Sequence, residues 1–114
     1  MYQHQHRNEA ALVRAAAARI KREYPPAFVT KIHGGGYQEV GLPDLLAINY
    51  GIAVWLEFKH RKPGETEEHA RGRTTEVQHA VMDRLRRAGA VSFTVLSVDE
   101  AMDACAAAWQ HMLP

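Results

Sequence analysis

The stretch that decides the fold is residues 43–59, PDLLAINYGIAVWLEFK. Residues 44–48 and 52–59 are runs of strand-forming side chains, and the Asn49-Tyr50-Gly51 segment between them is compatible with a tight turn. This pattern predicts a β-hairpin. If the turn holds two residues or four, Asp44 pairs with Glu57, whereas a three-residue bulged turn would shift the register.

Three ionisable side chains are predicted to meet at the open end of this hairpin. Strand alternation places Glu57 and Lys59 on one face, and the unshifted register places Asp44 across from Glu57, with Cβ atoms about 5 Å apart. Two facing carboxylates repel, so a raised pKa or a bound cation has to compensate. Hard oxygen ligands select Mg²⁺ or Mn²⁺, and such an ion beside a lysine suits phosphodiester hydrolysis. The alternative is an exposed Glu-Lys hairpin edge, with Asp44 following Pro43 in an ordinary turn.

The patterns on either side of the hairpin give the order αβββαβα. Helices are predicted over residues 8–24, 75–88 and 98–112, and further strands over residues 27–33 and 91–96. Residues 60–73 have no apolar periodicity and are predicted to form a long loop. A chain of 114 residues is expected to form one domain, residues 1–114. The order predicts an α/β fold with a mixed central sheet flanked by helices.

Two further polar side chains share helix faces with predicted core residues. Glu9 lies on the stripe of Leu12, where a carboxylate is costly unless it is paired or linked to a metal. The alternative is a first-turn glutamate favoured by the helix dipole. Gln78 shares a face with Val81, but it also ends a capping box that begins at Thr75, and the two roles are compatible.

Composition and cysteine usage exclude several classes of protein. No apolar run approaches the ~20 residues that cross a bilayer, and the N-terminal stretch lacks the apolar core of a signal peptide. The only cysteine, Cys105, has no internal partner, which suits a reducing compartment. No Cys/His spacing matches a structural zinc site. We therefore expect a cytoplasmic protein with no membrane contact and no small-molecule cofactor.

Basic residues are concentrated in the predicted loop, although the net charge of the chain is only +1. The concentrated residues are Arg61, Lys62, Arg71 and Arg73, and basic side chains of this kind can contact a phosphate backbone. The alternative is a solvated polar loop, in which Glu65, Glu67 and Glu68 offset the positive charge.

The hairpin motifs resemble the signature of the PD-(D/E)XK phosphodiesterase superfamily. The matching segments are Gly41-Leu42-Pro43-Asp44-Leu45 and Leu56-Glu57-Phe58-Lys59. The chain is also similar to one branch, the virus-type replication-repair nuclease (VRR-Nuc) domain, in its helical Glu9, in Gln78 followed by Leu85 and Gly89, and in Lys31 with glycines downstream. The resemblance spans roughly residues 5–100 and implies a restriction-endonuclease-like core.

The resemblance also implies a role for each matching residue. Asp44 and Glu57 would ligate Mg²⁺ or Mn²⁺, helped by the backbone carbonyl of Phe58. Lys59 would act on the nucleophilic water. Glu9 would complete the acidic site directly or through metal-bound water, and Gln78 would position the site or the scissile phosphate. Lys31, on the first strand, joins the loop residues as a predicted DNA contact.

Stand-alone domains of this kind resemble phage-encoded, homodimeric Holliday-junction resolvases. The resemblance therefore implies a metal-dependent DNA endonuclease that acts on branched DNA as a homodimer, in the host cytoplasm if it is phage-encoded. A twofold dimer would supply two sites for paired cuts. The rivals are an exonuclease or flap-type nuclease with the same site, and a non-catalytic DNA-binding module on a nuclease scaffold. The presence of Asp44, Glu57 and Lys59 together counts against a degenerate site.

Overall fold

A four-stranded mixed sheet lies at the centre of the computed structural model, which describes residues 8–33 and 39–112. The strands stand in the order β1-β2-β3-β4; they are β1 (Phe28–Lys31), β2 (Leu45–Asn49), β3 (Ile52–Phe58) and β4 (Val91–Val95). The first three form an antiparallel meander, and β4 runs parallel to β3. The predicted α/β fold with a mixed sheet is confirmed. The glycines downstream of Lys31, residues 34–36, lie outside the described residues.

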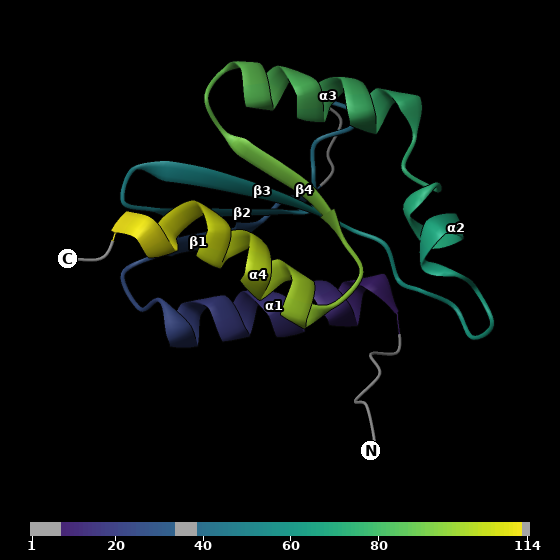
Figure 1. Cartoon of the computed structure of the whole chain (residues 1–114), viewed down its shortest axis with the longest axis horizontal. Helices are drawn as coiled ribbons and strands as arrows, with labels where there is room; N and C mark the ends of the chain where they lie inside the picture. Colours follow the sequence, from purple (N-terminus) through teal and green to yellow (C-terminus); the bar gives the residue numbers. More distant parts are fainter. Residues whose placement is uncertain (1–7, 34–38, 113–114) are drawn as a thin grey trace.

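Helices cover both faces of the sheet (Figure 1). The first face carries α1 (Glu9–Glu23) and α4 (Val98–Trp109), which is followed by the short 3-10 helix η1 (Gln110–Met112). The second face carries α3 (Glu76–Arg87). The main core lies between the sheet and the α1–α4 pair, where Leu56 and Phe58 of β3 and Trp109 of α4 are fully buried. None of the helices in the described part of the chain has the length and apolar character to span a bilayer.

The hairpin turn contains two residues and fixes the register of β2 against β3. Tyr50 has φ 53° and Gly51 has φ 73°, the left-handed pair that a two-residue type I′ turn requires. Asn49 then pairs with Ile52, and the register runs on to Leu45 opposite Leu56. One step further along the same register, Asp44 faces Glu57. The unshifted alternative of the sequence analysis is therefore confirmed.

The segment after β3 differs from the loop predicted over residues 60–73, because it contains α2 (Glu67–Arg71). The Thr66 hydroxyl caps this helix by accepting a hydrogen bond from His69 N at 3.1 Å. Ala70 anchors the helix by being fully buried. Five residues are too few to show an apolar period, so only the cap followed by two glutamates could have indicated the helix.

Several elements present their ends at the same end of the sheet (Figure 1). The first turn of α1, the carboxyl ends of β3 and β4, helix α2 and the first turn of α3 all lie there. Asn8 fixes where α1 begins and Thr75 fixes where α3 begins, because each side chain accepts a hydrogen bond from the first turn of its helix. The polar residues singled out in the sequence lie on these ends.

The segment that leads into Asp44 approaches α3 closely at Gly41. Gly41 has φ +90°, and a Cβ atom there would lie 2.8 Å from Val77 Cγ1 and 3.1 Å from the Val77 carbonyl oxygen. Only glycine fits this backbone conformation and this spacing without strain. Gly41 therefore lets residues just before Asp44 rest against the beginning of α3.

We predict that Gly41→Ala destabilises the protein more than Gly89→Ala. Both glycines have positive φ, but a Cβ atom at Gly89 meets nothing within 4 Å. The backbone strain of about 1–3 kcal/mol is therefore common to both variants, whereas overpacking of about 1–3 kcal/mol is added only at Gly41. Urea denaturation of the two variants measures the difference, and equal losses of stability would contradict the close approach.

Candidate active site

Asp44 is held against the end of β3 by its own side chain. Its Oδ2 atom accepts a hydrogen bond from Phe58 N at 2.8 Å, and its carbonyl oxygen accepts one from Ile32 N at 2.8 Å. Pro43, directly before it, is fully buried. The Asp44 carboxylate therefore has one oxygen fixed by the backbone of the neighbouring strand.

Glu57, Lys59 and Gln78 form a closed triangle of polar contacts. Lys59 Nζ lies 3.1 Å from Glu57 Oε2 and donates to Gln78 Oε1 at 3.2 Å. Gln78 Nε2 donates to the same Glu57 oxygen at 3.0 Å. The side chains of Glu57 and Lys59 are buried, with exposed fractions of 3% and 10%. The end of β3 thus supplies a lysine-glutamate pair that is shielded from bulk solvent, and α3 supplies the amide that holds it.

Gln78 has both of the roles that its sequence position allows. Its Oε1 atom accepts from Thr75 N at 2.9 Å, and Gln78 N donates to the Thr75 hydroxyl at 3.1 Å, which completes the predicted capping box. The same side chain contacts Glu57 and Lys59. The cap therefore fixes the amide, and the fixed amide orients the buried pair.

The second oxygen of Glu57, Oε1, is buried without a hydrogen-bond partner among the described residues. Burial, and after it repulsion from Asp44, raise the pKa of Glu57 to about 7 against the opposing effect of Lys59. Burial also raises the pKa of Asp44, although the Phe58 amide and Lys59 act in the other direction. The two carboxylates are therefore costly to ionise together, and a cation between them would relieve that cost.

Glu9 lies at the same end of the fold but is more exposed than its place on the apolar stripe predicted. Its side chain is 44% exposed. Glu9 Oε1 accepts from His60 N at 3.1 Å and lies 3.6 Å from Arg73 Nη1. Its negative charge raises the pKa values of both Asp44 and Glu57, so it contributes to the same acidic field.

The five predicted DNA contacts fall into two groups. Lys31, Arg61 and Lys62 are exposed, and none of the three forms an ion pair with another described residue. Arg71 and Arg73 instead form ion pairs within the chain, whereas Arg61 donates only to the Glu65 carbonyl, at 2.6 Å. Arg71 pairs with Glu100 at 2.6 Å and donates to the Thr94 carbonyl at 3.1 Å, which ties α2 to β4 and α4.

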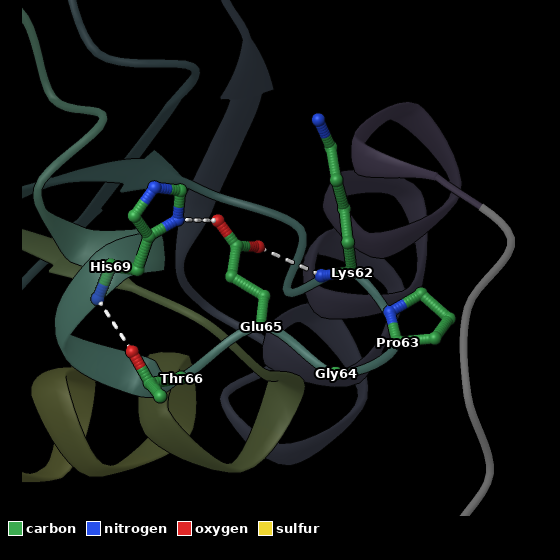
Figure 2. Close-up of a pocket in the computed structure, with 6 residues that line it drawn as sticks. All are labelled: Lys62, Pro63, Gly64, Glu65, Thr66 and His69. Atoms are coloured by element: carbon green, nitrogen blue, oxygen red, sulfur yellow. Dashed lines mark hydrogen bonds and ion pairs between the residues drawn. The ribbon is translucent and has the colours of Figure 1, made fainter.

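Glu65 is the residue that sequence reasoning missed. It was counted only as a charge that offsets its basic neighbours, yet its side chain is 7% exposed and accepts four hydrogen bonds. Figure 2 shows it between the His69 ring and Lys62 N, while the Lys62 side chain extends away. These bonds, with those from Arg73, hold the pKa of Glu65 at about 2. The spacing of Glu65 and His69 would have indicated this pair once α2 was recognised.

The donor set at the strand ends fits a small hard cation. No three histidine, cysteine or carboxylate side chains within residues 8–33 and 39–112 form a cluster that could hold a metal ion alone. Asp44 and Glu57 supply two carboxylates, and the carboxylate oxygen Oε1 of Glu57 has its coordinating capacity unused. One or two carboxylates, with water and substrate oxygens, is the usual protein contribution to Mg²⁺ binding. The residues present therefore fit Mg²⁺ or the similar Mn²⁺.

Comparison with known proteins identifies the fold. No protein-family model matches the chain, and neither does any curated protein sequence. A solved structure described as a VRR_NUC domain superposes with a TM-score of 0.57 at 22% sequence identity, covering 86% of this chain and 95% of that chain. The chain has the VRR_NUC fold. The resemblance expected from the sequence is thus confirmed at the level of the fold, including its restriction-endonuclease-like arrangement of sheet and helices.

We predict that, in EDTA, the free energy of unfolding of the wild type falls between pH 4.5 and about 7 relative to that of Glu57→Gln. Native Glu57 keeps its proton up to about pH 7, whereas the unfolded chain releases it near 4.5. The native state therefore binds more protons in this window, and stability is lost as the pH rises. The loss is expected to reach a few kcal/mol.

Chemical denaturation at a series of pH values measures this difference. Glu68→Gln, an exposed glutamate of α2, is the matched control and should follow the wild type. If Glu57→Gln also had the wild-type pH profile, the raised pKa of Glu57 would be refuted.

Proposed function

We propose that this VRR_NUC-fold chain is a Mg²⁺- or Mn²⁺-dependent DNA endonuclease, with residues 1–114 as its single catalytic domain. The observation that carries the proposal is a half-buried Asp44 carboxylate facing the buried Glu57 carboxylate, with Glu57 Oε1 unpartnered among the described residues and Glu57 Oε2 beside the Lys59 ammonium. Two facing carboxylates with an adjacent lysine, at the carboxyl end of an inner strand, suit metal-assisted phosphodiester hydrolysis.

Asp44 and Glu57 would hold the ion together with the backbone carbonyl of Phe58. A bound divalent ion neutralises the two carboxylates, polarises a phosphate oxygen and lowers the pKa of a bound water. Asp44 is suited to this task because the Phe58 amide fixes only one of its oxygens. Glu57 is suited because Oε2 is fixed by Lys59 and Gln78, while Oε1 is left for a ligand.

Lys59 would orient the attacking water and stabilise the charge that develops on the phosphate. Its ammonium group has three donors, and two of them are directed at Glu57 and Gln78. The third can reach a water molecule or a phosphate oxygen. Gln78 would hold the Lys59 and Glu57 side chains in their relative positions. Glu9 would add negative charge that favours binding of the cation.

The finer features of the proposal rest on the resemblance stated above. We infer that the substrate is branched DNA, such as a Holliday junction, and that a homodimer supplies paired cuts. Lys31, Arg61 and Lys62 are the exposed basic residues suited to the DNA backbone. A cytoplasmic location agrees with the single cysteine, Cys105, which is buried and free, whereas the phage origin rests on the resemblance alone.

We predict that the purified protein cleaves DNA in Mg²⁺ or Mn²⁺ and not in EDTA, and that Lys59→Ala reduces cleavage at least about 100-fold. The loss follows because a preorganised charge at the reacting phosphate is removed. Linear duplex, flapped and four-way-junction DNA are compared as substrates. Lys21→Ala, an exposed lysine at the other end of α1, is the matched control and should cleave like the wild type.

The same assay separates the rival functions. Cleavage that persists in EDTA, or full activity of Lys59→Ala, would contradict the mechanism. Shortening only from DNA ends would favour an exonuclease, and preferred cutting of the flapped substrate would favour a flap-type nuclease with the same site. Tight DNA binding without cleavage of any substrate would favour a non-catalytic module.

A further inference from the structure

A closed ring of contacts joins Arg73, Glu9 and the main-chain N–H and carbonyl of His60. Arg73 Nη2 donates to the His60 carbonyl at 2.6 Å, and Arg73 Nη1 lies 3.6 Å from Glu9 Oε1. That same Glu9 oxygen accepts a hydrogen bond from His60 N at 3.1 Å. The Arg73 guanidinium thus holds the His60 carbonyl directly, and it holds the His60 N–H through the Glu9 carboxylate.

Glu65 fixes Arg73 from behind. Its carboxylate accepts from Arg73 Nε at 2.9 Å and from Arg73 Nη2 at 3.1 Å, so that two nitrogens of the guanidinium bind one carboxylate. Such two-point pairs set the plane of the guanidinium as well as its position. Because Glu65 also accepts from Lys62 N and His69 Nδ1, the orientation of Arg73 is set by the folded segment 62–69 (Figure 2).

The ring is linked to the acidic site in two ways, by the continuity of the chain and by the charge of Glu9. His60 directly follows Lys59, so the His60 peptide governs where the chain leaves β3. Glu9 acts on Asp44 and Glu57 through its charge. By holding Glu9 and the main chain at His60, Arg73 therefore fixes the part of the site that follows β3.

We propose that Arg73 is a positioning residue that holds Glu9 against the main chain directly after Lys59, beside the metal-binding carboxylates, and that it does not contact DNA. All three nitrogens of its guanidinium group are directed at Glu65, Glu9 or the His60 carbonyl, and its side chain is 27% exposed. Neighbouring Arg61 and Lys62 are exposed and form no ion pair with another described residue, although Arg61 Nε donates to the Glu65 carbonyl at 2.6 Å. This inference rests on the proposed metal-dependent function.

The test measures Mn²⁺ binding by the protein alone, with free Mn²⁺ counted by its electron paramagnetic resonance signal. Arg73→Ala is expected to weaken Mn²⁺ binding on the order of tenfold, as the loss of outer contacts to a metal ligand commonly does. Glu9→Gln should weaken it similarly. The double variant should be no weaker than Glu9→Gln within about twofold, because both changes remove one interaction. Lys62→Ala, whose side chain extends away from Glu65 (Figure 2), is the matched control in the same segment and should bind Mn²⁺ like the wild type.

DNA binding in EDTA, measured by fluorescence anisotropy, separates positioning from a phosphate contact. Arg73→Ala should bind duplex DNA like the wild type, whereas Arg61→Ala should bind it more weakly. If Arg73→Ala proves unfolded by circular dichroism, Arg73→Lys replaces it. Lysine keeps the charge but cannot reproduce the planar fork, so the same loss of Mn²⁺ affinity is expected.

Unchanged Mn²⁺ affinity with weakened DNA binding in the Arg73 variant would overturn the inference, as would fully additive effects of Arg73→Ala and Glu9→Gln. Glu57→Gln distinguishes this failure from failure of the proposed function. If Glu57→Gln loses Mn²⁺ while the Arg73 variant keeps it, only the positioning role is wrong. If Glu57→Gln also keeps full Mn²⁺ affinity, the metal site itself is wrong.

Discussion

Burying the Glu57 carboxylate beside Asp44 costs free energy, and several surrounding elements reduce that cost. Glu57 lies on a strand whose opposite face forms the main core, so it cannot turn toward bulk water without losing Leu56 and Phe58 from that core. Its pKa of about 7 records the cost in the absence of a cation. A protein that only needed a stable hairpin would gain by placing a neutral side chain there. The buried acid therefore supports the proposed metal site.

The elements around Glu57 each reduce one part of that cost. The type I′ turn at Tyr50-Gly51 sets the register that brings Asp44 opposite Glu57, and Gly41 allows the segment before Asp44 to rest against α3. The cap of α3 delivers the Gln78 amide to one Glu57 oxygen, and Lys59 reaches the same atom. Because each contact falls on Oε2, the arrangement orients the carboxylate and leaves Oε1 for a ligand.

The sequence predicted the fold and the grouping of Asp44, Glu57 and Lys59, because both follow largely from local rules. Alternation and turn chemistry determine which face of β3 carries Glu57, and the capping box determines where α3 begins. The rest depends on contacts between distant segments, which no local pattern encodes. From the sequence, Glu65 is only a charge that offsets the basic residues of the loop. In the structure it organises residues 62–73 through its contacts with Arg73 and His69. Glu9 matched the helical period but lies in the first turn of α1, where the neighbouring groups are polar and partly exposed.

The most direct measurement is a crystal structure of the protein soaked with Mn²⁺, with data collected at the manganese absorption edge. The ion should give an anomalous peak between the Asp44 and Glu57 carboxylates, within the ~2.0–2.6 Å bonding range of hard divalent cations. Glu57 Oε1 should be one of its ligands. If saturating Mn²⁺ left both carboxylates without an ion, or bound only elsewhere on the protein, the buried acidic pair would need another explanation.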